Sequence, residues 1–460
     1  ASAGRNMAGI CASSLLAEFL GTFLLILTVG CNVLSQNPNW GGVSIACVLM
    51  VGIYALGSAS GANFNPAVSV ALGLAGKMDE GWKQVGAYCG VQVAAGLCAA
   101  GAYSALFGST FNLGPTKNHA WWQAMLCEML YTFMLVFVVL NTAASKKLGG
   151  KNQFYGLAIG FVIVAGAYGP GAVSGGCFNP AVAIGIDAIS AGKGFGWCIL
   201  YTAFELLGAA LAVGLFSAMR PEERSNDDAP ISYELPSKLI GEFIGTFMLV
   251  LTVGLNVLGG SKSAAFSIAA SLMCMIYAIG DVSGAHFNPA VTLAILGSGR
   301  GKLLPADAGA YIGTQILAGI VGALTYEAVH SGITFPLGPG LCFDWGSVAV
   351  AEIVFTAVLA FVVLCVATTD KNPAPQLTGF IIGMCITVGG LAIGQISGGS
   401  LNPAVSIGVA TVRKLIGYGT FYTGLVYVLF EVIGAAVAVA CFRLSYPEEY
   451  APKAELFGLE

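Results

Sequence analysis

Charged side chains are scarce in this 460-residue sequence. Asp, Glu, Lys and Arg make up only 9% of the residues, whereas a typical soluble domain carries about 25%. Hydrophobic residues make up 57%, and a soluble globule of that composition would precipitate. We therefore expect the chain to lie in a lipid bilayer. The net charge of −4 comes without any basic tract, so nothing indicates binding to nucleic acid.

Patterns that would indicate catalysis or metal binding are also missing. The sequence shows no nucleophile–base constellation and no nucleotide-binding loop. Its 13 cysteines follow neither disulfide nor zinc spacing. Most of them lie inside apolar runs, where packing in the core is their expected role. We expect no enzyme activity, no cofactor and no metal.

Long apolar runs are abundant, and each is long enough to cross a bilayer as a helix of about 20 residues. The pattern predicts twelve spans. They lie at residues 14–35, 42–60, 83–107, 121–143, 154–170, 196–219, 237–259, 264–282, 306–330, 346–368, 376–393 and 420–443.

The sequence is duplicated. AEFLGTFLLILTVGCNVL at 17–34 returns as GEFIGTFMLVLTVGLNVL at 241–258. Between the copies lies a polar stretch with three prolines, which is typical of an exposed linker. The predicted organisation is a first unit, a linker, a second unit and a C-terminal tail, at residues 1–220, 221–236, 237–446 and 447–460.

Each unit is itself a repeat. AEFLGTF at 17–23 is similar to CEMLYTF at 127–133, and GEFIGTF at 241–247 pairs more weakly with AEIVFTA at 351–357. A half-unit then holds three spans, and because three is odd the second half enters the membrane inverted. If both chain ends are cytoplasmic, most Lys and Arg residues fall on the cytoplasmic side, as the positive-inside rule requires. In an organelle that side would be the stroma or the matrix.

The tripeptide Asn-Pro-Ala occurs once in each half-unit. Asparagine is a favoured N-cap and proline is favoured at the first helical position, so each tripeptide predicts a helix start. The apolar runs that follow, at 68–75, 182–189, 291–297 and 405–412, are too short to span a membrane. We expect half-membrane helices there. The four tripeptides are Asn65, Pro66, Ala67; Asn179, Pro180, Ala181; Asn288, Pro289, Ala290; and Asn402, Pro403, Ala404.

Two inverted half-helices would meet end to end near the midplane of the membrane. Each N-terminus carries about half a positive charge, and each asparagine would keep its NH2 group free to donate to a passing oxygen. The result would be a small polar spot in an apolar tube, with a field that disfavours cations. Four chance helix starts are the alternative, but spacings of 114, 109 and 114 residues argue against chance.

These residues resemble the major intrinsic protein family, the aquaporins and glycerol facilitators. SGAHFNPAVT at 283–292 is similar to the family's first-loop signature, and the EFxGTF pattern at 18–23 and 242–247 is similar to its first helix. The resemblance covers nearly the whole chain, twice. It implies an all-helical membrane fold in which each unit has six transmembrane helices, two half-helices and one pore. Members usually form tetramers, so two chains would supply four units.

The resemblance also implies a buried glutamate on the first and fourth helices of a unit that holds the backbone of the two loops. Glu18, Glu128, Glu242 and Glu352 match those places, and their expected role is scaffolding rather than catalysis. Glu205 and Glu431 lie in the sixth helix, where members usually carry an apolar residue or proline. Each is expected either to be tied to a loop or a neighbouring helix, or to line the pore.

The filter departs from the family pattern. Members usually carry an arginine straight after the second Asn-Pro-Ala, and here a valine follows in both units. We expect a wider constriction without fixed positive charge, and therefore weaker exclusion of cations. The filter positions carried over from the family are Ile45, Ala167, Gly176 and Val182 in the first unit, and Ile268, Gly390, Gly399 and Val405 in the second.

The expected function is passive passage of water and of small neutral solutes such as ammonia, urea and glycerol. One alternative is a non-conducting structural subunit of a larger membrane assembly, which the loss of both arginines favours and the four intact tripeptides oppose. Another is an active transporter, for which Glu205 and Glu431 are the only candidate coupling sites.

Overall fold

The structure, a computed structural model, describes residues 10–116, 118–224, 231–369 and 372–451. Within these ranges the regular structure is helical and contains no strand. The chain divides into two compact units between Ile231 and Ser232. The middle of the predicted linker, residues 225–230, and the end of the predicted tail, residues 452–460, lie outside the described residues.

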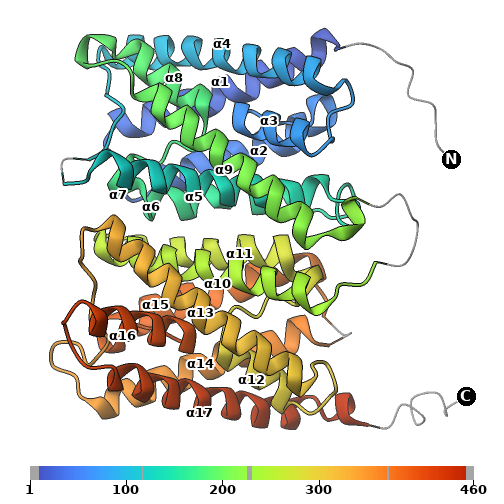
Figure 1. Cartoon of the computed structure of the whole chain (residues 1–460), viewed down its shortest axis with the longest axis vertical. Helices are drawn as coiled ribbons and strands as arrows, with labels where there is room; N and C mark the ends of the chain where they lie inside the picture. The colour runs from blue at the N-terminus through green and yellow to red at the C-terminus, as the bar shows by residue number, and fades with distance from the viewer. Residues whose placement is uncertain (1–9, 117, 225–230, 370–371, 452–460) are drawn as a thin grey trace, which may run out of the picture. The chain divides into compact units, whose positions relative to one another are not determined.

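Each unit combines long helices with two half-helices (Figure 1). The helices of unit one are α1 (Ala12–Leu34), α2 (Gly41–Ser60), α3 (Pro66–Leu74), α4 (Gly81–Phe107), α5 (Trp121–Val139), α6 (Tyr155–Tyr168), α7 (Gly171–Ser174), α8 (Pro180–Ile189) and α9 (Trp197–Met219). The helices of unit two are α10 (Leu235–Leu258), α11 (Ala264–Ser283), α12 (Pro289–Gly297), α13 (Pro305–Val329), α14 (Trp345–Ala367), α15 (Thr378–Ser397), α16 (Pro403–Leu415) and α17 (Tyr422–Ser445).

The four predicted half-helices are confirmed. Helices α3, α8, α12 and α16 each begin at the proline of an Asn-Pro-Ala tripeptide, and the asparagine before it is the N-cap. The side-chain oxygen of that asparagine accepts a hydrogen bond from the backbone N–H of the alanine, at 2.8–3.0 Å. Because proline has no N–H to leave unpaired at a helix start, the tripeptide satisfies the first turn by itself.

One predicted span is interrupted. Eleven helices of the described chain are long and apolar enough to cross a membrane, not twelve, because the span predicted at 154–170 is the 14-residue α6 followed by the short α7. Pro170 lies at the break, where its missing N–H and its ring prevent α6 from continuing. The equivalent position in unit two is Ile393, which precedes Asn402 by the same nine residues as Pro170 precedes Asn179. Because isoleucine can continue a helix, α15 has no break there.

Glycines bring the half-helices close to the long helices. A Cβ at Gly96 of α4 would lie 2.5 Å from the carbonyl oxygen of Ala181, at the start of α8, and a Cβ at Gly319 of α13 would lie 2.3 Å from that of Ala404. Both sites exclude any side chain, so helix and half-helix meet backbone to backbone. By contrast, Gly86 and Gly90 of α4 have no atom within 4 Å of such a Cβ, so they do not pack against another helix of the described chain.

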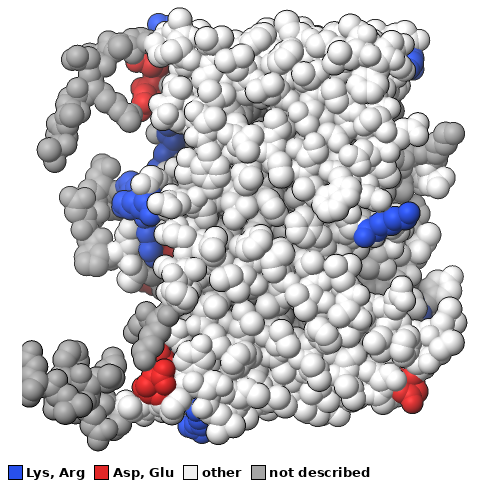
Figure 2. Space-filling model, turned by 180° about the vertical axis from the view of Figure 1, so that it is seen from behind, with Lys and Arg blue, Asp and Glu red and all other residues white. Residues whose placement is uncertain are grey.

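The ends of the units carry the charged contacts. On the face shown in Figure 2, charged side chains gather near helix ends and leave the surface between them uncharged. Glu223 accepts hydrogen bonds from Lys77 Nζ and from the Lys146 backbone N–H, both at 2.7 Å. In unit two Arg300 Nη1 donates to Glu449 at 2.8 Å.

Two predicted boundaries lie at these contacts. Residues 221–223 were predicted as the start of an exposed linker and residues 447–450 as the start of the tail. Both segments form short 3-10 turns, and each is tied by its glutamate to a cation just after the first half-helix of its unit. The partner cations lie about 150 residues earlier in the sequence, so polar composition alone could not predict these ion pairs.

Candidate functional site

In unit one the two Asn-Pro-Ala loops are bonded directly to each other. Asn65 Nδ2 donates to the carbonyl oxygen of Phe178 at 2.8 Å, and Asn179 Nδ2 donates to that of Phe64 at 2.9 Å. The sequence had led us to expect free NH2 groups, and this expectation is wrong in part, because each NH2 group makes one hydrogen bond. Each NH2 carries two donors, and one of them bonds to the opposite loop. The second donor remains for a passing oxygen.

The carbonyl groups that accept these bonds belong to residues with a left-handed backbone. Phe64 has φ 51° and Phe178 has φ 54°, a conformation that is uncommon for a bulky side chain. Such strain costs of order 1–3 kcal/mol and persists only where surrounding contacts fix it. Here it lets the chain turn back between the membrane-spanning helix and the half-helix, with its carbonyl oxygen toward the opposite asparagine.

Unit two repeats this arrangement. Asn288 Nδ2 donates to Leu401 O at 2.8 Å and Asn402 Nδ2 donates to Phe287 O at 2.9 Å. Phe287 and Leu401 are left-handed as well, with φ 51° and 54°. Both units therefore contain a complete and intact pair of loops.

A cavity of about 1070 Å³ runs along the loops of unit one. Its lining residues on α1 extend from just before the helix, at Cys11, to Val33 near its end. Those 22 residues correspond to a rise of about 33 Å at 1.5 Å per residue, which is the hydrocarbon thickness of a bilayer. Both asparagines of the Asn-Pro-Ala loops, Asn65 and Asn179, line the cavity.

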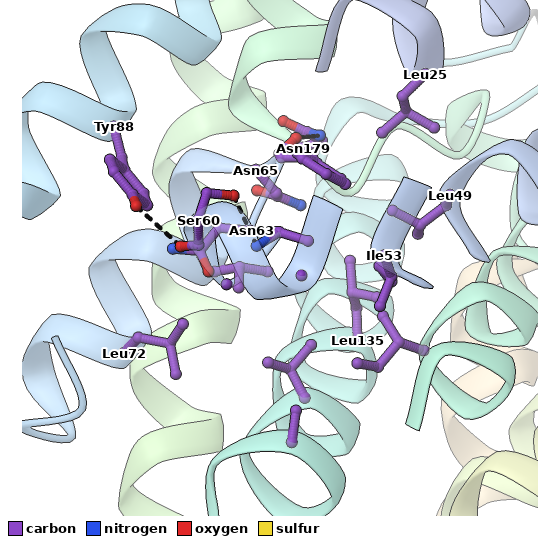
Figure 3. A pocket seen from close by; sticks show the side chains of 18 of the residues that line it. Leu25, Leu49, Ile53, Ser60, Asn63, Asn65, Leu72, Tyr88, Leu135 and Asn179 are labelled. Carbon is purple, nitrogen blue, oxygen red and sulfur yellow. Dashed lines mark hydrogen bonds between the residues drawn. The ribbon is translucent and has the colours of Figure 1, made fainter. Parts of the chain in front are cut away.

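The wall of the cavity has a polar side and an apolar side (Figure 3). Ser60, the last residue of α2, and Asn63, in the loop before α3, lie next to the asparagines, whereas the spanning helices contribute leucines such as Leu25, Leu49 and Leu135. The charged residues among its described lining are Lys77, Asp79 and Glu80, all between α3 and α4 at one end. An ion in the uncharged interior would lose hydration without gaining a counter-charge, so the cavity suits neutral molecules.

The four filter positions of unit one all line this cavity. Ile45 comes from α2, Ala167 from α6, Gly176 from the loop before α8 and Val182 from the first turn of α8. The first three are half-buried and Val182 is buried. In unit two Ile268, Gly390 and Gly399 are likewise half-buried and Val405 is buried; a Cβ at Gly399 would lie 3.6 Å from the Gly390 Cα. No cationic side chain stands at these positions.

The glutamates of the first helices hold the first loops. Both oxygens of Glu18 accept bonds, from Ser60 Oγ and the Asn63 N–H on one and from the Phe64 N–H and Gln92 Nε2 on the other, at 2.6–2.9 Å. Glu242 makes the corresponding four contacts in unit two. These carboxylates satisfy loop N–H groups that the half-helix geometry leaves without backbone partners.

The glutamates of the fourth helices hold the second loops. Glu128 accepts from the backbone N–H groups of Cys177 and Phe178 at 3.0 and 2.7 Å. Glu352 accepts from those of Ser400 and Leu401 at 3.1 and 2.9 Å. All four of these glutamates are fully buried, and their observed contacts are those of scaffolding groups.

Glu205 and Glu431 are each tied to the second loop of their unit. Glu205 Oε1 accepts from the N–H of the pore residue Asn179 at 2.8 Å, and Glu431 Oε1 accepts from that of Asn402 at 3.0 Å. Both side chains are fully buried, and Glu205 is absent from the lining of the cavity in unit one. Of the two alternatives left open by the sequence, the contacts favour attachment to a loop.

The family model of the major intrinsic proteins matches residues 9–216, 156–258 and 237–442. The chain belongs to the major intrinsic protein family. The first and third matches are the two units. The second match joins the end of unit one to the start of unit two, as expected when each unit of a major intrinsic protein is built from two similar halves. With eleven long apolar helices among its described residues, this member of the family is a multi-pass integral membrane protein.

The chain is similar to aquaporins from two plants. Aquaporin NIP1-4 of Oryza sativa subsp. japonica is 35% identical over 225 residues, which cover 47% of this chain and 79% of the relative. The probable aquaporin NIP-type of Nicotiana alata is 35% identical over 219 residues, covering 45% and 77%. Among solved structures, the aquaglyceroporin from Plasmodium falciparum matches 48% of this chain with all of its own, at 21% identity and a TM-score of 0.40. Each of the two plant relatives thus corresponds to about one unit.

Sequence reasoning missed several residues that shape the site. Gln92 and Gln315 join the first-helix glutamates to the half-helices, and no local motif marks them. Tyr201 and Tyr427 donate from their hydroxyl groups to the carbonyl oxygens of Ser174 and Ser397, before the second loops. Their matched positions in the two units are a signal that could have found them.

Proposed function

We propose that each unit is a passive channel for water and small neutral solutes, with ammonia and urea passing more readily than glycerol. The observation that carries this proposal is the cavity of unit one, which passes both asparagines and all four filter positions. Its polar side offers hydrogen-bond partners that replace those a solute leaves in water, and its apolar side offers none that would hold the solute tightly.

The filter supports passage of solutes larger than water. Ala167 and Gly176 contribute little volume, and Val182 replaces a long cationic side chain by a short apolar one. A constriction excludes neutral solutes by its size and cations by its charge. The loss of arginine relaxes both, while the positive ends of α3 and α8 continue to oppose cations.

The test is swelling and shrinkage of proteoliposomes that contain the full chain, recorded by light scattering. We expect water flux above that of protein-free vesicles, together with faster entry of at least one of ammonia, urea and glycerol. The matched control is the pair Ile45→Trp and Ile268→Trp, which places a bulky ring at the same filter position of each unit. This variant should lower solute flux while the protein still elutes as a folded species in gel filtration.

The alternative, a non-conducting structural subunit, predicts a different outcome. Fluxes of water and of all three solutes would then equal those of protein-free vesicles, although the wild-type protein is folded. If water alone passes, the channel function stands but the proposed role of the apolar filter is wrong.

A further inference from the structure

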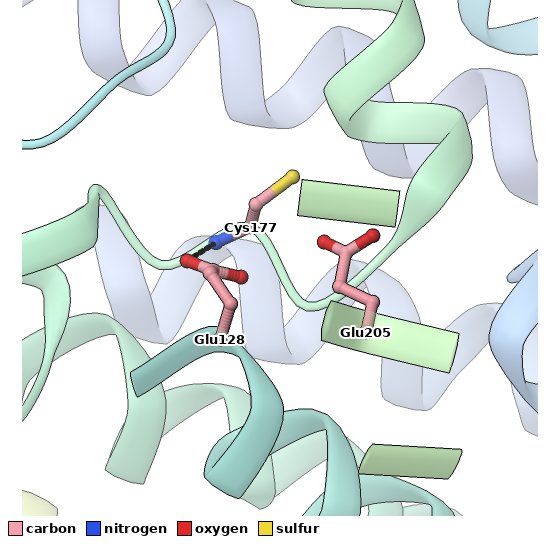
Figure 4. A group of neighbouring side chains, drawn as sticks. All are labelled: Glu128, Cys177 and Glu205. Carbon is pink, nitrogen blue, oxygen red and sulfur yellow. Dashed lines mark hydrogen bonds between the residues drawn. The ribbon is translucent and has the colours of Figure 1, made fainter. Parts of the chain in front are cut away.

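Three potential metal ligands converge in unit one behind the second Asn-Pro-Ala loop. They are the carboxylates of Glu128 on α5 and Glu205 on α9, and the thiol of Cys177 in the loop before α8 (Figure 4). One ligand atom from each lies within 4.8 Å of the others. All three residues are buried, Cys177 at 9% exposure and both glutamates at 0%.

One atom of this group has no hydrogen-bond partner in the described chain. Glu205 Oε1 accepts the Asn179 N–H, but Glu205 Oε2 is buried and accepts no hydrogen bond. The Cys177 thiol is near enough to interact with Glu205, yet its hydrogen bond goes to the carbonyl oxygen of Asn179, at 3.5 Å. A buried carboxylate oxygen without a partner is costly, and a cation would relieve that cost.

Unit two provides a comparison within the same chain. Ser400 takes the place of Cys177, and Ser406 takes the place of Ala183. The two hydroxyl groups lie 2.7 Å apart, and Ser406 Oγ donates to Glu431 Oε1 at 2.8 Å. Glu431 Oε2 is unpartnered, as in unit one. The pair of carboxylates is therefore common to both units, and the thiol is what distinguishes unit one.

We infer that unit one binds one divalent cation of the zinc class through Glu128, Cys177 and Glu205, and that unit two does not. Zinc takes thiolate sulfur at about 2.3 Å and carboxylate oxygen at about 2.0–2.2 Å, in tetrahedral geometry. Ligand atoms in such a site lie about 3.5 Å apart; since the three lie within 4.8 Å of one another, the side chains need to close by at most about 1.3 Å. A thiolate prefers zinc to magnesium or calcium, which take oxygen ligands.

The charge of the bound cation is accounted for. Cys177 lines the cavity of unit one, so water from the cavity can fill the fourth position. On binding, the thiol loses its proton to water in the cavity and the sulfur–metal bond forms, with no change of oxidation state. The cation then neutralises negative charge that would otherwise be buried against the loop.

The experiment measures binding to the purified full chain in detergent, without any measurement of flux, so its result is independent of the channel function. The probe is Co²⁺, which gives a thiolate-to-cobalt charge-transfer band, followed by displacement with Zn²⁺. We expect the band to saturate at one Co²⁺ per chain and to disappear when Zn²⁺ is added. Mg²⁺ at the same concentration should not displace Co²⁺.

Two exchanges between the units serve as matched variants. Cys177→Ser with Ala183→Ser gives unit one the hydroxyl pair of unit two and should reduce binding from one equivalent to none. Ser400→Cys with Ser406→Ala gives unit two the thiol of unit one and should raise it to two. Each exchange copies a pair that already packs in the homologous place, so folding should survive, and gel filtration checks it.

Three results would overturn the inference. The first is the absence of a charge-transfer band in the folded wild-type protein. The second is a band that persists unchanged after the Cys177→Ser, Ala183→Ser exchange, because one of the other 12 cysteines would then be the ligand. The third is a band that Glu205→Gln leaves unchanged in affinity, because the unpartnered carboxylate oxygen would then have no part in binding.

Discussion

Replacing a buried glutamate by glutamine should cost more stability at Glu18 than at Glu205, although both are fully buried and both hold an Asn-Pro-Ala loop. Glu18 uses its two oxygens to accept from the N–H groups of Asn63 and Phe64, one on each oxygen. In Glu18→Gln one oxygen becomes an NH2 group, which faces a backbone N–H that cannot turn away. Glu205 bonds to a loop N–H through one oxygen only.

The expected magnitudes follow from these contacts. Leaving one buried N–H without an acceptor costs about 1–3 kcal/mol, which is about a 5- to 150-fold change in the folded-to-unfolded ratio. Ser60 and Gln92, the side-chain partners of Glu18, can rotate and accept instead of donate, so they add little. Glu205→Gln keeps its one acceptor and places the new NH2 group where no donor is met, so its cost should be below about 1 kcal/mol.

The assay is thermal unfolding of the full chain in detergent with a chelator present, so that bound metal does not contribute. Glu18→Gln should lower the unfolding midpoint clearly, and Glu205→Gln should not. Glu242→Gln and Glu431→Gln repeat the comparison in unit two and should behave in the same way. The reasoning fails if Glu205→Gln destabilises the protein as much as Glu18→Gln does, because hydrogen-bond number would then not determine the cost.

Three further predictions concern the pores and the packing. Divided after Ile231, each unit expressed alone should conduct in vesicles, and conduction by the full chain only would contradict independent pores. Val182→Arg with Val405→Arg should reduce solute flux more than water flux. Each new arginine should also repel a cation 5 Å away by roughly 3 kcal/mol at an effective dielectric near 20. An unchanged ratio of water flux to solute flux in the folded variant would place the constriction elsewhere. Gly21→Ala should destabilise unit one by about 1–3 kcal/mol, because its Cβ would lie 2.1 Å from the Phe64 ring. Gly90→Ala is the control: its Cβ would have no atom within 4 Å, so the unfolding midpoint should stay unchanged or rise.

Features that depend on neighbouring residues in the chain were predictable. The start of α3 at Pro66 follows from the Asn-Pro pair alone, because the N-cap bond closes within two residues. The ends of the spanning helices follow from the lengths of apolar runs. The break at Pro170 could have been found in the same way, since proline cannot continue a helix, but the apolar residues on both sides concealed it.

Features that depend on distant contacts were not predictable from the residues themselves. Phe64 has no local reason to adopt a positive φ, and its conformation is fixed by Glu18 on one side and Asn179 on the other. The site at Cys177 was invisible to cysteine spacing because its three ligands come from α5, a loop and α9. Gly86 and Gly90 have the spacing of a packing motif, but only the fold shows that they face away from the other helices of unit one.

The bonds between the two loops also set an order of events during synthesis. Asn65 cannot donate its hydrogen bond until Phe178 is synthesised, 113 residues later, and Phe64 cannot accept its bond until Asn179 is synthesised, 115 residues later. At about 5–20 residues per second, the first loop spends roughly 6–23 s without its partner. Glu18 has already left the ribosome by then and can hold the N–H groups of Asn63 and Phe64, so the loop enters the bilayer partly satisfied.

The second unit makes the same bonds among its own residues, from Asn288 to Leu401 and from Asn402 to Phe287. Every bond of this kind in unit one can therefore form before the first loop of unit two is synthesised. The duplication doubles the number of loop pairs without lengthening the interval during which any loop lacks its partner in the membrane.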